Sequence, residues 1–384
     1  MKLYNILLSA LLATTIVSCD GNDILPETPE IPETPEQPTE GYQFTFGGSI
    51  DTDEEATRAS WTEEYTDANN KNHLKFGWDY TDEKNPTYDM KMAFVKGSQV
   101  LTSTKNQNST DVTILIHSTK GDDRHWAEFK TVERYENELK AYDGHTLIAV
   151  NGKGCELKQI GDKYAFQLTM PNTFTQSAAN SLAHLSDYMY MYDTYELQGG
   201  DAHLKFKHLT APVRFRIHNW RPSEVKIYSA SMLLSDNTAI TGSSVSVDKD
   251  TDKDKPSYTS GHSEITVKAA DDSYFTIAER SQNKYIDLYA HVLPLAGTLE
   301  GKTIQFTIEA NDIVTGEKKV HYLTSKEDHI SAEKFYKATN SYNWQAGNLY
   351  TFHIYLDDAI YGVTVSSVSI KNWENENLGT SETE

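Results

Sequence analysis

Residues 213–217, with the sequence VRFRI, alternate strictly between apolar and charged side chains. Successive side chains of a β-strand point to opposite faces, so this stretch has one apolar and one charged face. The same alternation recurs along the chain, most clearly at residues 74–78, 90–94, 112–116, 164–168, 204–206, 304–308 and 349–354. Glycine, asparagine and aspartate separate these short segments. The pattern predicts an all-β protein built of antiparallel sheets, arranged as sandwiches or barrels.

The N-terminus is typical of an exported protein. An apolar run at residues 3–17 follows Lys2 and is too short for a permanent membrane span, which predicts a signal peptide over residues 1–18. It ends in the sequence IVSC, which resembles the lipobox of bacterial lipoproteins and makes Cys19 the lipidation site. Several acyl chains (palmitate among them) on one residue would anchor the chain stably to the outer membrane. The alternative is an ordinary secretory signal with an incidental cysteine. Once Cys19 is acylated, Cys155 has no disulfide partner and is expected to be a small buried side chain.

A proline- and glutamate-rich linker is expected at residues 19–40. Residues 26–38 read PETPEIPETPEQP, with a proline at every third position. Polyproline II has three residues per turn, so the prolines share one edge of an extended rod and the glutamates repel one another. This segment is not expected to join a core.

Length and charge bound the remainder of the chain. The roughly 340 residues after the linker exceed what one hydrophobic core usually holds, so two domains are expected, at residues 41–200 and 201–384. The boundary is placed at Gly199-Gly200, after a stretch at residues 178–195 that favours a short helix leading into a strand. The net charge of −21 makes nucleic acid a poor partner.

Several short motifs, in this order, resemble the fimbrillins of Bacteroides-type bacteria. They are the lipobox, residues 57–61 (TRASW), residues 206–217 (FKHLTAPVRFRI) and residues 347–352 (GNLYTF) followed by Trp373. The resemblance spans the whole mature chain. It implies two transthyretin-like β-sandwich domains in a subunit that assembles with other fimbrial subunits into surface fibres for adhesion. The host or bacterial surface ligand stays open.

The resemblance also implies a maturation step. Fimbrillins of the polymerising kind are cut after an arginine, which here would separate Arg58 from Ala59 and release the anchor together with the first strand. Tyr42, Phe44 and Phe46 would form the apolar face of that strand, and a strand from a neighbouring subunit would fill the groove left behind. The alternative is that Arg58 is an ordinary surface arginine and the anchor is kept.

The strand that a subunit would donate is expected near the C-terminus. Residues 362–373 alternate, with Val363, Val365, Val368 and Ile370 as the apolar positions, but the phase slips at Ser366-Ser367. The segment is either a donor or the last core strand of the second domain. If it cannot donate, the chain is a tip or accessory subunit, or a stand-alone surface lipoprotein.

No catalytic motif is present, so we expect no enzyme, no cofactor and no metal. The sequence lacks G-x-S-x-G, H-E-x-x-H and the phosphate-binding G-x-x-x-x-G-K. Residues 248–254 resemble the start of an EF-hand loop, but Lys253 and Thr259 stand where glycine and glutamate are needed. A hydrolase with an unrecognised site is one rival. The other is a glycan-binding surface lipoprotein, with Trp78, Trp126 or Trp220 as a platform.

Overall fold

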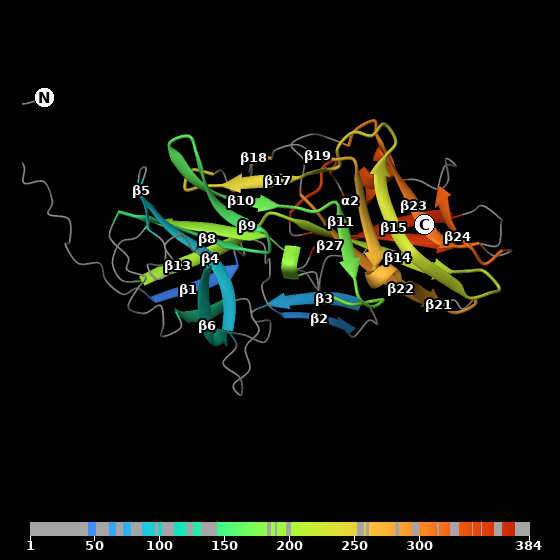
Figure 1. Ribbon diagram of the computed structural model, residues 1–384, viewed down its shortest axis with the longest axis horizontal. Coiled ribbons are helices and arrows are strands. Elements are labelled where there is room, and N and C mark those ends of the chain that lie inside the picture. The colour runs from blue at the N-terminus through green and yellow to red at the C-terminus, as the bar shows by residue number, and fades with distance from the viewer. Residues whose placement is uncertain are drawn as a thin grey trace, which may run out of the picture. The chain divides into compact units, whose positions relative to one another are not determined.

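A computed structural model gives the structure of the protein (Figure 1). It describes residues 45–50, 61–66, 72–77, 87–96, 99–101, 111–120, 126–131, 144–182, 186–188, 190–196, 201–251, 257–258, 261–280, 284–293, 299–312, 315–322, 330–339, 341–346, 348–356 and 363–372. These residues belong to one compact unit that starts at Gly41. The predicted signal peptide, Cys19 and the linker lie outside the described residues. None of the helices described is long and apolar enough to cross a membrane.

The described part of the chain is built almost entirely of β-strands, as the alternation predicted. The largest sheet has the order β5-β4-β6-β7-β1-β13-β12-β8. Its strands are β1 (Thr45–Ile50), β4 (Thr87–Lys96), β5 (Gln99–Leu101), β6 (Asp111–Lys120), β7 (Trp126–Thr131), β8 (Thr146–Asn151), β12 (Met191–Glu196) and β13 (Asp201–His208). The C-terminal half of β4 also pairs with β8, so β4 connects β6 to β8.

Two further sheets, built mainly from the C-terminal half of the chain, pack face to face. One has the order β11-β20-β15-β23-β24, with β21 on β15 and β25 on β23. Its strands are β11 (Thr173–Gln176), β15 (Val225–Leu234), β20 (Glu264–Ala269), β21 (Phe275–Ile277), β23 (Thr303–Asn311), β24 (Lys318–Tyr322) and β25 (Ile330–Ser331). The other has the order β22-β14-β26-β27, formed by β14 (Ala211–Asn219), β22 (Tyr285–Val292), β26 (Asn348–Leu356) and β27 (Val363–Asn372).

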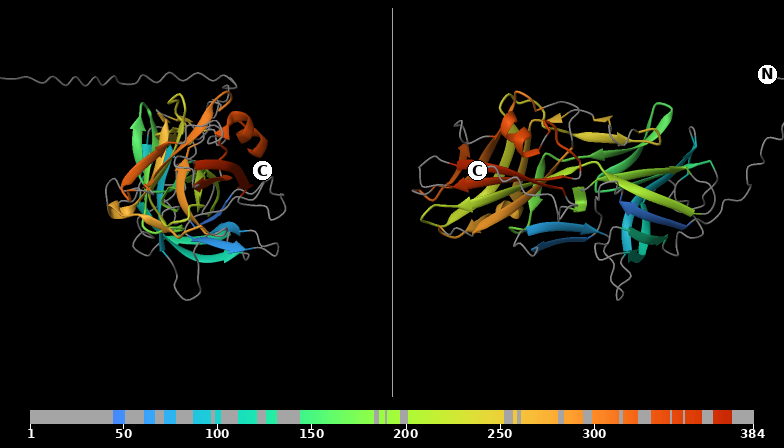
Figure 2. Two further views of the ribbon diagram at one scale, coloured as in Figure 1. Left: turned by 90° about the vertical axis from the view of Figure 1, so that its right-hand side faces the viewer. Right: turned by 180° about the vertical axis from the view of Figure 1, so that it is seen from behind.

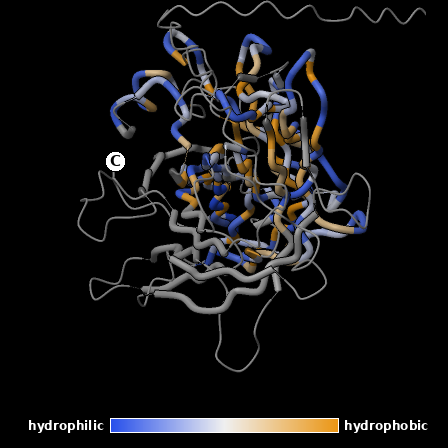
Figure 3. Tube along the Cα trace, turned by 90° about the vertical axis from the view of Figure 1, so that its left-hand side faces the viewer, coloured by the Kyte–Doolittle hydropathy of each residue, from blue (hydrophilic) through white to orange (hydrophobic). Residues whose placement is uncertain are grey.

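Aromatic contacts join these two sheets. The ring of Phe306 on β23 lies 6.2 Å from that of Phe215 on β14 and 5.0 Å from that of Phe352 on β26. All three side chains are buried, and the hydrophobic segments of the trace concentrate in the interior of the molecule (Figure 3). The apolar residues of VRFRI, among them Phe215, thus point into the core as predicted.

A four-stranded sheet and two strand pairs complete the set. The sheet has the order β18-β17-β10-β9 and consists of β9 (Cys155–Ile160), β10 (Lys163–Thr169), β17 (Ser244–Val247) and β18 (Ser257–Tyr258). The pairs are β2 (Trp61–Thr66) with β3 (Asn72–Gly77), and β16 (Thr241–Gly242) with β19 (Gly261–His262). Cys155 is buried, as predicted.

Helices are few among the described residues. They are the 3-10 turns η1 (Ser186–Tyr188) and η2 (Ala270–Asp272) and the helix α2 (Ala332–Thr339). Figure 2 shows α2 beside β27, which it contacts. The short helix leading into a strand that was predicted within residues 178–195 corresponds to η1 followed by β12.

Strands from the N-terminal half of the chain pair with strands from the C-terminal half. β17, from the C-terminal half, pairs antiparallel with β10, and β11, from the N-terminal half, pairs in parallel with β20. The buried apolar side chains of both halves form one cluster. β13, which follows the expected boundary at residue 200, lies in the same sheet as β12. The division into two domains at that position stays a prediction.

Candidate functional site

The first strand lies inside the largest sheet, between two strands from distant parts of the chain. β1 pairs antiparallel with β7 over four residue pairs and in parallel with β13 over six. Phe46 is opposite Phe129 on one side and Ala202 on the other. β1 therefore satisfies the backbone hydrogen-bonding groups of two neighbours, and its loss would leave an open slot between them.

The other residues predicted for maturation lie outside the described residues. These are Tyr42, Phe44, Arg58 and Ala59. In the sequence, Arg58 falls between the end of β1 at Ile50 and the start of β2 at Trp61.

The predicted donor segment is the edge strand β27, paired antiparallel with β26. Its four apolar positions are opposite four buried residues of β26: Val363 faces Leu356, Val365 faces Ile354, Val368 faces Phe352 and Ile370 faces Tyr350. The register shifts where Ser367 is opposite His353 and Val365 opposite Ile354. Ser366 is thus the extra residue of a β-bulge, which explains the phase slip in the sequence.

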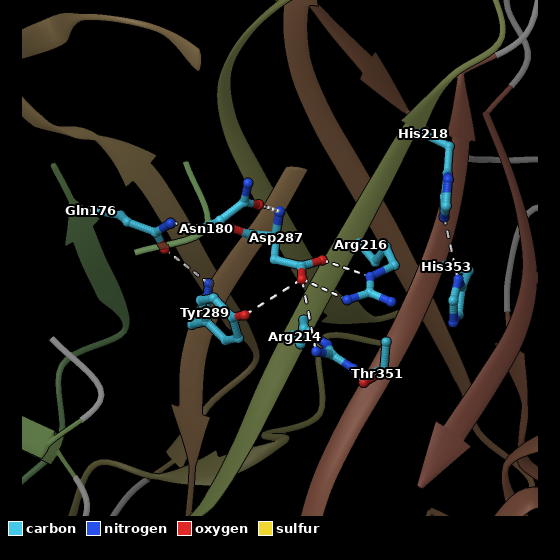
Figure 4. A network of polar contacts seen from close by, with 9 residues as sticks. All are labelled: Gln176, Asn180, Arg214, Arg216, His218, Asp287, Tyr289, Thr351 and His353. Atoms are coloured by element: carbon cyan, nitrogen blue, oxygen red, sulfur yellow. Dashed lines mark hydrogen bonds and ion pairs between the residues drawn. The ribbon is translucent and has the colours of Figure 1, made fainter. Parts of the chain in front are cut away.

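A buried ion pair joins Arg216 to Asp287 in the sheet β22-β14-β26-β27 (Figure 4). It lies on the face of this sheet opposite to the one that carries Phe215. Arg216 on β14 donates to both carboxylate oxygens of Asp287 on β22, with Nε–Oδ1 2.8 Å and Nη2–Oδ2 2.7 Å. Arg214 lies 3.7 Å from the same carboxylate, and its Nε donates a hydrogen bond of 3.0 Å to the hydroxyl of Thr351. Burial disfavours the charged form of Arg216, but the hydrogen bonds and charge of Asp287 outweigh it and raise the pKa of the guanidinium.

The free edge of β22 is capped by two amide side chains, Gln176 at the end of β11 and Asn180 four residues later. Gln176 donates a hydrogen bond of 3.0 Å to the carbonyl of Asp287 and accepts one of 3.1 Å from the N–H of Tyr289. Asn180 accepts 2.6 Å from the N–H of Asp287 (Figure 4). The side chains stand in for a further strand, so this edge is closed to pairing with another chain.

Two histidines lie side by side on the same face. The Nε2 of His218 on β14 is 3.3 Å from the Nδ1 of His353 on β26, and the rings stack with centroids 5.6 Å apart. Burial, followed by the nearby charge of Arg216, lowers the pKa of each to about 4. Both rings are therefore neutral at pH 7, with one nitrogen donating to the other.

The contacts of this cluster join neighbouring strands. Asp287 bonds to arginines and not to a histidine, and within the described part of the chain no hydroxyl or thiol is bonded to His218 or His353. Within the described ranges no group of histidine, cysteine, aspartate and glutamate could hold a metal ion. At residues 248–251, the carboxylate of Asp248 accepts from the N–H of Asp250 and the hydroxyl of Thr251. This closes a turn after β17, which pairs antiparallel with β18.

Comparison with known proteins gives structural likeness alone. No protein-family model and no curated protein matches the chain. A candidate cell adhesion protein from Bacteroides uniformis aligns with 12% identity and a TM-score of 0.42, covering 88% of this chain and 100% of its own. A fimbrial protein from Bacteroides vulgatus aligns with 10% identity and a TM-score of 0.37, covering 74% of this chain and 92% of its own. The tip fimbrial protein Mfa3 from Porphyromonas gingivalis aligns with 10% identity and a TM-score of 0.29, covering 75% of this chain and 94% of its own.

Proposed function

We propose that this chain is a structural subunit of a surface fimbria involved in adhesion, either a pilin or an accessory or tip subunit. It is exported as a lipoprotein through Cys19, reaches the outer membrane and the cell surface, and assembles with other fimbrial subunits by exchanging strands. Its contact with the membrane is the lipid anchor. Nucleic acid is not a partner, and no enzymatic activity is assigned.

The position of β1 is the observation that carries the proposal. β1 is the first strand of the chain to be described, yet it lies between β7 and β13 inside the sheet. A single cut after Arg58 would separate it, with Tyr42, Phe44, Phe46 and the anchor, from every strand from β2 onward. Removal would expose backbone groups on both sides of the slot together with apolar surface.

The slot specifies what can fill it. An incoming strand must run parallel to β13 and antiparallel to β7, with apolar side chains at alternate positions to replace those of β1. At ~25 cal/mol per Å² of apolar surface, refilling such a groove contributes several kcal/mol per joint. Backbone hydrogen bonds to the two neighbours would fix the register.

We propose β27 as the strand that a neighbouring subunit supplies. Among the described strands it is an edge strand with one partner, β26, and it carries Val363, Val365, Val368 and Ile370 at alternating positions broken by the bulge. Its pairing with β26 supports the alternative equally: β27 as a core strand, in a tip or accessory subunit that receives a strand and does not donate one.

Limited proteolysis tests the mechanism. The chain from residue 20 is treated with a trypsin-like protease and followed by intact mass and native gel mobility, with Arg58→Ala as the matched control. We expect one cut after Arg58 in the parent chain, followed by a ladder of oligomers. The Arg58→Ala control should show neither the cut nor the ladder. A clean cut after Arg58 that leaves monomers only would rule out the polymerising mechanism.

A second candidate function is a stand-alone surface lipoprotein that binds glycans. The observation in its favour is Trp220, which is 39% exposed and lies edge-on to Tyr355 at 4.9 Å. The side chains of Trp78 and Trp126, the other platforms suggested by the sequence, lie outside what the structure describes. A monomer that binds sugar without forming a ladder after proteolysis would favour this function.

A further inference from the structure

The longest parallel pairing among the described strands joins β14 to β26. Seven residues of β14, from Val213 to Asn219, each lie opposite a residue of β26. The N–H of Trp220 extends this ladder by donating a hydrogen bond of 2.7 Å to the carbonyl of Leu356. Hydrogen bonds in a parallel ladder are evenly spaced, so no rung stands apart from the others. The two strands are therefore joined along the whole of their shared length.

The backbone connects this pair to both places where the proposed fibre would join its subunits. Only two buried residues, Leu209 and Thr210, lie between β14 and β13, which borders the slot of β1. At the other end, β26 leads into β27, the proposed donor strand, through residues 357–362. Tension between subunits would therefore reach β14 at its first residue and β26 at its last.

The direction of the strands decides how the pair would be loaded. A strand that replaces β1 runs parallel to β13, and β27 follows the body of its own subunit in the chain. That body would thus lie toward the N-terminal end of β13, and its pull would pass along β13 to the N-terminal end of β14. The donated β27 would pull β26 from its C-terminal end. Because β14 and β26 are parallel, the two pulled ends lie at opposite ends of the pair.

A strand pair pulled from opposite ends is loaded in shear. All of its rungs then resist together, and the strands separate only when many hydrogen bonds break at once. An antiparallel pair connected to the same two points would be pulled from one end and would open rung by rung. The parallel direction of β14 and β26 is therefore the feature that lets the pair resist tension.

Side chains that lie opposite each other reinforce the ladder. Arg214 is opposite Thr351 and donates to its hydroxyl at 3.0 Å. His218 is opposite Tyr355, and their rings stack with centroids 4.5 Å apart. The Nε2 of His218 also lies 3.3 Å from the Nδ1 of His353. These contacts depend on the register, so sliding β26 along β14 would break them together with the backbone ladder.

Burial on both faces keeps water away from the ladder. On the core side, the ring of Phe306 lies 6.2 Å from Phe215 and 5.0 Å from Phe352, which are opposite each other. On the other side, Arg214 and Thr351 are buried. Hydrogen bonds are stronger where the local dielectric is low, and water that is excluded cannot replace them as they lengthen.

From this arrangement we infer that the β14–β26 pair is a mechanical clamp, which carries the tension of a surface fibre through the subunit in shear. The inference rests on the proposed strand exchange, because that exchange defines where load enters and leaves the chain. It adds a function that assembly alone does not require, which is to keep the subunit folded while the fibre is pulled. The partners that load the clamp are further subunits, one at each end.

Single-molecule force spectroscopy on the chain from residue 20 tests the clamp. Cysteine handles in a Lys205→Cys and Asp358→Cys variant pull the pair from opposite ends, through β13 and through the segment after β26. Handles in a matched Ser223→Cys and Asp358→Cys variant pull it from one end, because Ser223 follows β14. Lys205 and Ser223 are exposed, and the native Cys155 is buried away from the linkers. We expect the first variant to unfold at more than about twofold higher force, since its rungs must break together.

Urea unfolding midpoints of the two variants are the control. They should agree, so that a difference in force reflects the direction of pulling and not stability. Equal unfolding forces in the two directions would overturn the inference, and they would do so even in a chain that forms oligomers after cleavage. A higher force from opposite ends in a chain that never forms oligomers would support the clamp and reject the proposed assembly instead.

Discussion

Arg216 and Asp287 form a two-pronged ion pair across neighbouring strands, with only 12% and 2% of their side chains exposed. Arg216 also places its guanidinium 4.0 Å from the ring centre of Tyr285. The pair therefore fixes β14 against β22 at a position where water does not reach the carboxylate. Removing one partner of such a pair destabilises the fold by more than the intact pair stabilises it, because the remaining charge stays buried.

Replacement of Asp287 by alanine is expected to destabilise the protein by ~3–5 kcal/mol, because Arg216 would keep a buried charge without its carboxylate. Urea unfolding followed by tyrosine and tryptophan fluorescence measures the change. The control is Asp250→Ala, which removes an exposed partner of Lys163 and should not alter the midpoint measurably. Equal midpoints for the Asp287→Ala variant and the parent would show that the pair does not hold the sheet.

Stability is expected to fall as the pH is lowered from about 6.5 toward 4. His218 and His353 have pKa values near 4 in the folded chain, against an ordinary value of 6.5, so the unfolded chain binds more protons in this window. Each pKa unit of difference corresponds to ~1.4 kcal/mol. Unfolding midpoints measured at several pH values give the slope, and a His218→Gln and His353→Gln double variant should flatten it. An unchanged slope in that variant would assign the acid sensitivity to other groups.

The contact between Gly152 and Tyr190 predicts a strong effect of one methyl group. A Cβ at Gly152 would lie 2.0 Å from the ring of Tyr190, which is buried and bonded through its hydroxyl to the carbonyls of Lys153 and Thr169 at 2.6 Å each. Gly152 also has a φ of +125°. Gly152→Ala should therefore destabilise by at least ~2–3 kcal/mol through clash and backbone strain.

Gly161→Ala is the matched control for that prediction. Gly161 has a φ of +65°, but a Cβ there meets nothing within 4 Å, so the variant carries only the backbone strain. Thermal unfolding of the two variants separates clash from strain. A similar fall in melting temperature in both variants would mean that the ring of Tyr190 moves aside.

The strand pairing between the two halves of the chain predicts one cooperative unfolding transition for residues 41–384. β10 pairs with β17 and β11 with β20, so neither half keeps its sheets intact when the other unfolds. Differential scanning calorimetry should give a single peak whose van't Hoff and calorimetric enthalpies agree. Two separated peaks would show instead that the halves unfold as independent domains, as tandem sandwiches would.

Local sequence determined the strands of this protein. Alternation correctly placed β14, β23 and β26 and the direction in which Phe215, Phe306 and Phe352 point, because side-chain period is a property of each strand alone. The break in phase at Ser366-Ser367 in the sequence likewise marks the position of the bulge. The short helix leading into a strand at residues 178–195 was also a local signal, and the structure has η1 followed by β12 there.

Only the tertiary structure decided which strands meet. Alternation alone predicts only that Arg214 and Arg216 share a charged face, whereas in the structure Arg214 is buried and Arg216 is 12% exposed, both beside Asp287. Backbone hydrogen-bonding groups are the same in every residue, so the sequence of β1 does not say that it pairs in parallel with β13. Nor does the turn before Tyr274 reveal that Tyr228, almost fifty residues earlier, will lie against it. Such long-range contacts depend on how all the strands pack at once, and that is decided by the whole fold.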